Sequence, residues 1–251
     1  MIMALVLAAG CSGDSLSMVT VVFDNVLWQD SAGRPAVAGL ETGWGFAVVV
    51  ETSGSTVLFD TGADGDVLLS NMEALGLSPD SVDAVVLSHR HADHCGGLPE
   101  LLQRAQPEIF LLQEFADAAP PHLRQVVTAP RTIAPGVLTT GPVAGPLTEQ
   151  ALVVQTEEGP LVICGCAHPG AAAMARAAAE AFGIGPWMVM GGFHMGSASS
   201  EEALELAESL ESLGVQMVAP THCTGRNCRS VLRERFGSRF AEGGLGWSLK
   251  L

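Results

Sequence analysis

Apolar residues fall in short runs separated by Gly, Pro and acidic positions, a pattern typical of a chain that forms many short strands. Residues 19–25 are rich in β-branched and aromatic side chains. Two further runs, residues 44–51 and 56–60, predict a β-hairpin that turns at Ser53-Gly54. We therefore expect the fold to open with antiparallel strands.

After this hairpin the pattern predicts alternating helices and strands. Residues 67–75 have helical spacing, with Asp66 as the expected cap and Gly76 as the stop. The same reasoning predicts strands at residues 82–87, 109–112, 151–155, 161–164, 187–190 and 216–219, and helices at residues 97–103, 171–182, 200–213 and 227–236. The chain thus has two halves, each with strands for one sheet and helices to cover it. This arrangement predicts an αββα sandwich within one domain of residues 18–251.

One long stretch has no clear periodicity. Residues 116–146 are rich in Pro and Ala, and we expect them to form an irregular insertion that covers the substrate.

The charge balance narrows the range of partners. The chain has 251 residues and a formal net charge of -15, from 27 acidic residues against 12 Lys and Arg. This charge disfavours nucleic acid, because the phosphate backbone would be repelled, and it favours cations. We expect a small-molecule substrate, and the apolar runs are too short to span a membrane.

The N-terminus suggests a location. Residues 1–10 are apolar, end in small residues and lead into Cys11, as at the end of a bacterial lipoprotein signal. In this interpretation residues 1–17 are a signal or tether, Cys11 carries a lipid anchor, and the protein lies in the periplasm or on the cell envelope. The run is short and lacks Lys and Arg, so the alternative is an ordinary N-terminus of a cytoplasmic protein.

The densest chemical signal follows the predicted strand at residues 82–87. Three imidazoles and a carboxylate fall within six positions, as His89, His91, Asp93 and His94. An extended strand end places His89 and His91 on one side, and the following turn directs Asp93 and His94 to a second point nearby. One loop could thus bind one or two ions, and these donors suit zinc best, with iron or manganese as alternatives.

Three further histidines each follow a predicted strand, namely His168, His194 and His222. Strand ends on one side of a sheet converge, so six of the seven histidines should meet, with His122 outside. We predict His168 and His222 as metal ligands. His194 could be a ligand or could contact the substrate.

The loop H-x-H-x-D-H after a strand resembles the metal loop of the metallo-β-lactamase superfamily, and the resemblance runs from about residue 19 to the C-terminus. It implies the αββα fold, and it implies that Asp60, in a Leu-Phe-Asp-Thr-Gly motif, supports the metal loop without binding metal. A narrower resemblance is to the branch that includes dihydropterin ribofuranosyl-aminobenzene phosphate synthase-like proteins, mostly metal-dependent hydrolases. Four motifs carry it: Trp44-Gly45-Phe46, Gly165-Cys166-Ala167-His168-Pro169-Gly170, Gly191-Gly192-Phe193-His194 and Thr221-His222-Cys223-Thr224-Gly225.

The chain departs from the superfamily pattern at the bridging ligand. Cys166 stands where an aspartate is usual, and residues 139–148 contain no histidine. His168 could supply the missing imidazole. Cys166 could offer a thiolate or could be a small buried hydrophobic residue, so one ion and two ions both stay open.

The resulting hypothesis is a hydrolase in which metal-activated water attacks a small organic substrate. Asp93 would hold and orient the water, and His194 could stabilise the leaving group. Two alternatives remain: a transferase of the synthase type, in which another nucleophile attacks, and a non-catalytic metal- or ligand-binding module on the same fold.

Overall fold

The computed structural model describes residues 18–251, and its core is two mixed β-sheets. The first sheet has the order β13 (Ser248–Lys250), β1 (Met18–Asp24), β2 (Phe46–Glu51), β3 (Thr56–Phe59), β4 (Ala84–Val86), β5 (Glu108–Leu112) and β6 (Arg124–Val127). Its pairs are antiparallel from β13 to β3 and parallel from β3 to β6. The predicted signal segment and Cys11 lie outside the described residues, so the lipid anchor stays a prediction.

The second sheet contains the strands from β7 to β12. Its order is β12 (Met217–Thr221), β11 (Met188–Gly192), β10 (Pro160–Cys164), β9 (Leu152–Gln155), β8 (Val137–Thr139) and β7 (Arg131–Ala134). The strands β10, β11 and β12 run parallel, so their carboxyl ends meet at one edge of the sheet.

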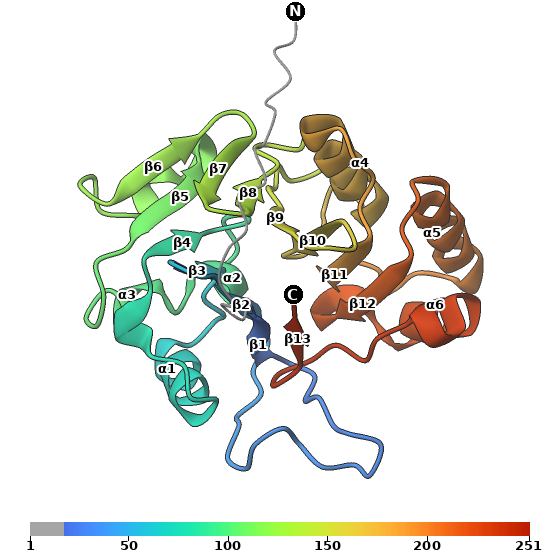
Figure 1. The fold of residues 1–251 in the computed structure, drawn as a ribbon, viewed down its shortest axis with the longest axis horizontal. Coiled ribbons are helices and arrows are strands. Elements are labelled where there is room, and N and C mark those ends of the chain that lie inside the picture. The colour runs from blue at the N-terminus through green and yellow to red at the C-terminus, as the bar shows by residue number, and fades with distance from the viewer. Residues whose placement is uncertain (1–17) are drawn as a thin grey trace, which may run out of the picture.

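Helices cover the outer faces of both sheets, and Figure 1 shows the resulting four layers. The first sheet carries α1 (Gly65–Ala74), α2 (Ala92–Cys95) and α3 (Leu98–Leu101), and the second carries α4 (Ala171–Phe182), α5 (Ser200–Ser212) and α6 (Arg226–Phe236). Four short 3-10 helices complete the fold: η1 (Pro79–Ser81), η2 (Gln113–Ala118), η3 (His222–Thr224) and η4 (Gly237–Arg239). The predicted αββα sandwich is confirmed.

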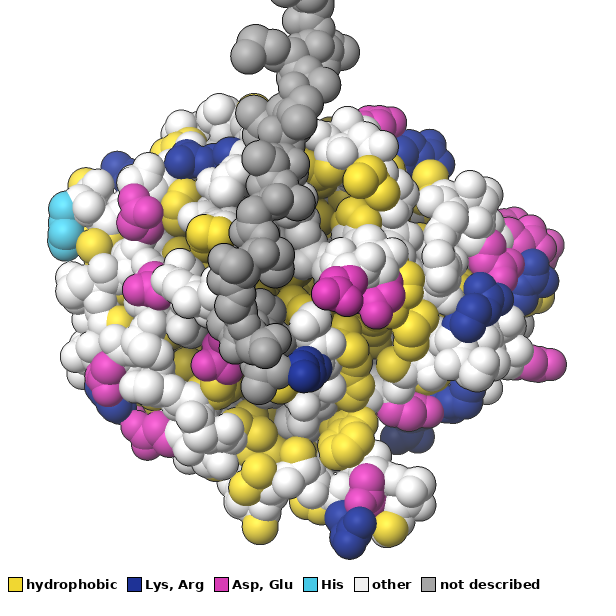
Figure 2. Space-filling model, viewed as in Figure 1, with side chains coloured by type: hydrophobic (Ala, Val, Ile, Leu, Met, Phe, Trp, Pro, Cys, Tyr) yellow, Lys and Arg dark blue, Asp and Glu magenta, His cyan; other side chains and the backbone are white. Residues whose placement is uncertain are grey.

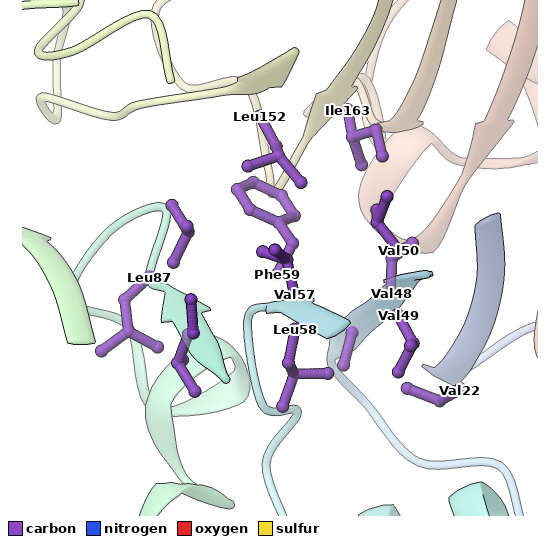
Figure 3. Packing of buried hydrophobic residues seen from close by; sticks show 14 of the residues in the cluster. Val22, Val48, Val49, Val50, Val57, Leu58, Phe59, Leu87, Leu152 and Ile163 are labelled. Atoms are coloured by element: carbon purple, nitrogen blue, oxygen red, sulfur yellow. The ribbon is translucent and has the colours of Figure 1, made fainter. Parts of the chain in front are cut away.

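The core between the sheets follows from the two-residue period of the strands. In Figure 3, Phe59 and Val50 point toward Leu152 and Ile163 of the second sheet, while Leu58 points to the opposite face. All five side chains are fully buried. Burial of one such side chain stabilises the fold by about 1.5–3 kcal/mol, so this layer holds the two sheets together.

A second apolar cluster lies between the second sheet and its helices. The face of α4 that packs on β10 and β11 consists of Ala171, Met174, Ala175 and Ala178, which recur at helical spacing and are buried. Because three of the four are alanines, the helix can lie close to the strands.

The largest error in the sequence prediction concerns residues 116–146. The predicted insertion is wrong, because this stretch contains β6, β7 and β8 and thus the far edges of both sheets. These strands are only three or four residues long, and Pro and Gly lie between them, which hid their pattern.

Two smaller corrections concern element ends. The cap of α1 is Asp64, whose carboxylate accepts a hydrogen bond from the Val67 N–H at 3.1 Å, whereas Asp66 lies in the first turn. The short strand β13 at the C-terminal end was not predicted.

The surface in Figure 2 carries acidic and basic side chains next to one another over α5 and α6, at the right of the view. Ion pairs account for part of this arrangement, since Glu211 binds both Arg235 and Arg239. Among the helices of residues 18–251, none combines the length and the apolar character that a membrane crossing requires.

Candidate metal centre

The loop that follows β4 presents four of the predicted donors. Helix α2 begins directly after His91, so Asp93 and His94 fall in its first turn. His89 and His94 are fully buried, His91 is exposed, and the Asp93 side chain is 20% exposed. The loop therefore offers donors both to the interior and to the open side of the site.

The fold brings every predicted ligand together in two adjoining groups. His89, His91 and His168 form one group, in which one donor atom from each residue lies within 4.8 Å of the others. A second group, under the same limit, contains Asp93, His94, Cys166 and His222. The groups adjoin because the rings of His89 and His94 lie 4.3 Å apart. His122 is exposed and belongs to neither group.

One atom in the first group lacks a partner. Within residues 18–251, Nε2 of His89 is the only buried side-chain nitrogen or oxygen without a hydrogen bond. An unpaired buried polar atom costs about 1–3 kcal/mol. Burial lowers the pKa of both His89 and His94 to about 3, so these imidazoles are neutral near pH 7 and their nitrogen lone pairs can bind a cation. The residues therefore fit a metal ion.

Asp60, at the carboxyl end of β3, fixes the orientation of this loop. Its carboxylate accepts hydrogen bonds from the Ser88 N–H at 2.7 Å and the Ser88 hydroxyl at 2.7 Å, and it contacts His94 Nδ1 at 2.6 Å. Burial raises the pKa of Asp60 to about 8. When Nδ1 of His94 donates its hydrogen to the ionised carboxylate, the lone pair of Nε2 in that ring faces the site, which is the role that the resemblance implied for Asp60.

The same contacts explain Gly165. A Cβ atom at this position would lie 2.2 Å from the Ser88 hydroxyl oxygen and 2.9 Å from Oδ2 of Asp60. Any side chain there would displace the hydrogen bonds that orient His94.

Glu149 orients residues of the candidate site, and it was not predicted from the sequence. Its buried carboxylate accepts backbone hydrogen bonds from Cys166, Ala167 and His168, each at 2.9 Å, and it contacts His168 Nδ1 at 3.0 Å. Burial opposes ionisation, but the hydrogen bonds from His168 lower the pKa of Glu149 to about 2. Glu149 thus fixes the loop after β10 and turns Nε2 of His168 toward the site.

His222 is oriented by a residue at the end of β1. Its Nδ1 lies 2.9 Å from Oδ1 of Asn25, so Nε2 faces Asp93 Oδ2 at 3.5 Å. Burial disfavours the imidazolium, but Asp93 raises the pKa of His222 above its ordinary value. This proton must leave before Nε2 can bind a cation.

Cys166 lies among the donors of the second group. Its sulfur is 3.3 Å from Nε2 of His94 and 3.5 Å from Nε2 of His222. The hydrogen bond with Cys223 and burial raise the pKa of the Cys166 thiol. A nearby cation favours the thiolate, and the two distances favour the ligand interpretation of Cys166 over that of a buried hydrophobic residue.

His194 occupies the exposed rim of the site. Its ring lies 4.3 Å from that of His168, and a third donor group joins it to Cys166 and Cys223. This position allows contact both with a ligand residue and with a molecule that enters from solvent.

Backbone strain is concentrated at the same place. Four non-glycine residues of the described chain have positive φ angles: Asp60, Ala167, His194 and His222. Such conformations cost about 1–3 kcal/mol each and cluster at functional sites. All four belong to the residues that form or orient the donor groups.

The sequence as a whole identifies the class of protein. A profile of the Metallo-beta-lactamase superfamily matches residues 43–222, and the chain belongs to this superfamily. Within it, the chain is similar to 7,8-dihydropterin-6-methyl-4-(beta-D-ribofuranosyl)-aminobenzene-5'-phosphate synthase of Methanocaldococcus jannaschii. The two are 27% identical over 85% of this chain and 91% of that protein.

Solved structures agree with this assignment. Tm1679, described as a metal-dependent hydrolase of the beta-lactamase superfamily, matches with a TM-score of 0.75 and 28% identity, over 94% of this chain and 99% of that one. The metallo-beta-lactamase fold protein YhfI from Bacillus subtilis shares the fold, with a TM-score of 0.64 and 16% identity, over 94% of this chain and 99% of that one.

The substitution Glu149→Gln tests the orienting role of this carboxylate. The amide keeps the shape but replaces an acceptor oxygen by a donor, so we expect zinc affinity to fall about 10- to 100-fold. Competition with a chelator measures the affinity, and a thermal unfolding scan verifies that the variant is folded. The matched control is Glu157→Gln, at an exposed position. Unchanged zinc affinity in Glu149→Gln would contradict the role.

Proposed function

We propose that this chain is a hydrolase of a small organic substrate that uses one or two metal ions, with zinc as the preferred ion. The observation that carries the proposal is the convergence of two donor groups, one of which contains the unpaired buried nitrogen of His89. The similarity to a metal-dependent hydrolase of the same superfamily supports it.

The donor types support zinc. The first group offers three imidazoles, and the second offers two imidazoles, a carboxylate and a thiol. Imidazole, thiolate and carboxylate are the usual ligands of zinc, and imidazole with carboxylate also suits iron and manganese. A bound ion would supply Lewis acidity toward the attacked oxygen and would acidify a water molecule.

Asp93 is the carboxylate that can act on the reacting groups. Its side chain is 20% exposed, whereas those of Asp60 and Glu149 are fully buried. Its pKa stays well below the ordinary range, because the hydrogen bond from His222 outweighs the effect of burial. Asp93 is therefore ionised near neutral pH, and it can accept a hydrogen bond from a water molecule and so hold and orient it.

His194 is suited to protonate the leaving group. It lies at the rim, beside His168 and open to solvent. From this position the imidazole can donate a proton to the leaving group while the loop histidines remain neutral.

A second candidate is a transferase of the synthase type, in which a nucleophile other than water attacks. The observation that favours it is the similarity to the Methanocaldococcus jannaschii synthase, which extends over most of both chains. The metal centre would be shared by both reactions, so product analysis has to separate them.

A screen of esters, lactones, β-lactams and phosphodiesters against the zinc-loaded protein tests the proposed reaction. We expect turnover of at least one class, and in isotopically labelled water the product should carry solvent oxygen. Turnover without incorporated label would favour the transferase. Metal-loaded protein that turns over none of the four classes would contradict the hydrolase proposal in its present form.

The substitution His194→Asn tests the proton-donating role. Asparagine tolerates the left-handed backbone at this position, where φ is 51°, so the fold should persist. We expect kcat to fall about 100-fold or more, with unchanged metal content. Elemental analysis decides between the interpretations, since loss of metal would place His194 among the ligands instead.

A further inference from the structure

A cavity of about 740 Å³ adjoins the metal centre. His222 and Cys223 form its boundary with the donor groups, and Trp44 with three arginines of α6 forms much of the remaining wall. The roles proposed above for the loop histidines and Asp93 involve neither Trp44 nor α6. The composition of this wall therefore carries separate information about what enters the site.

The arginines Arg226, Arg229 and Arg233 share one face of α6. They are three and four residues apart, the spacing that places side chains one above the other on a helix. They are three of only 12 basic residues in a chain of net charge -15. Positive charge is therefore concentrated at this cavity, against the character of the protein as a whole.

The positive charge of the cavity is only partly compensated. Glu242 binds Arg229 at 3.1 Å and Arg233 at 2.8 Å. The Arg226 side chain is exposed, and it has no hydrogen-bond or ion-pair partner among residues 18–251. It also lies in the first turn of α6, where the helix dipole favours an anion. Two of the three guanidinium groups thus share the carboxylate of Glu242, and the third, that of Arg226, lies nearest to the helix start.

Trp44 gives the cavity a flat apolar wall. Its side chain is 60% exposed, although large aromatic side chains are usually well covered. The ring lies 5.0 Å from that of His222, at an angle of 49°. A planar group that packed on this indole would lie beside the metal centre.

We propose that this cavity binds the anionic end of the substrate, a phosphate or carboxylate group, on the arginines of α6, with an aromatic or heterocyclic ring on Trp44. The guanidinium fork matches both oxyanions. The assignment of this ligand as the substrate rests on the proposed hydrolase function. Binding of the anion itself can be measured without turnover.

Calorimetric titration of the zinc-loaded protein tests the proposal with three probes: phenyl phosphate, benzoate and the uncharged benzamide. We expect Arg226→Gln to weaken binding of the preferred anionic probe about tenfold, the loss of one charge-assisted hydrogen bond. Benzamide binding should not change. The better anionic probe in the wild-type protein identifies phosphate or carboxylate as the group recognised.

Two further variants complete the design. Arg176→Gln removes an exposed arginine of α4 that does not line the cavity, and it should bind all probes as the wild-type protein does. Trp44→Ala should weaken binding of all three probes, because each has a ring. Equal affinity of Arg226→Gln and wild type for both anions would overturn the proposal, as would equal weakening by Arg176→Gln.

Elemental analysis of the same samples separates the two proposals. A wild-type protein that binds no zinc but still depends on Arg226 for anion binding would contradict the hydrolase and support the anion site. Full zinc content and turnover with no effect of Arg226→Gln would contradict the anion site alone.

Discussion

Two buried carboxylates, Asp60 and Glu149, determine how the rings of two site histidines face the site. Each accepts several hydrogen bonds, and each contacts Nδ1 of a histidine and thereby directs Nε2 of that imidazole into the site. A buried carboxylate is stable only when its oxygens are hydrogen-bonded. The donors to Asp60 come from the loop after β4, and those to Glu149 come from the loop after β10, so each carboxylate fixes one of the two loops that supply the donor groups.

The sheet topology supplies the positions on which this constraint acts. Asp60 follows β3, the metal loop follows β4, and the other three site histidines follow β10, β11 and β12. Parallel pairing brings these strand ends to common edges. The apolar layer around Phe59 and Leu152 holds the edges opposite each other. The positive φ angles at Asp60 and His222 show that the packing sustains strained backbone at buried residues of the site.

Much of the centre could be predicted from the sequence, because H-x-H-x-D-H is dense and because histidines after strands signal convergence. Glu149 and Asn25 could not, since a single acid or amide beside a strand gives no pattern, and their roles depend on tertiary contacts. The prediction for residues 116–146 was wrong because the three short strands there are stabilised by pairing with neighbouring strands and show no local periodicity. The arginine face of α6 is visible as helical spacing, but only the fold places it beside His222.

The central claim, that these side chains form a metal centre, is tested most directly by the metal content of purified wild type, His91→Ala and His122→Ala. His91 is exposed, so its replacement should leave the fold intact, and His122 is an exposed histidine outside the donor groups. We expect one to two ions per chain in the wild type and in His122→Ala, and a clear loss in His91→Ala. Undiminished metal in His91→Ala, or a wild type that binds none, would contradict this claim.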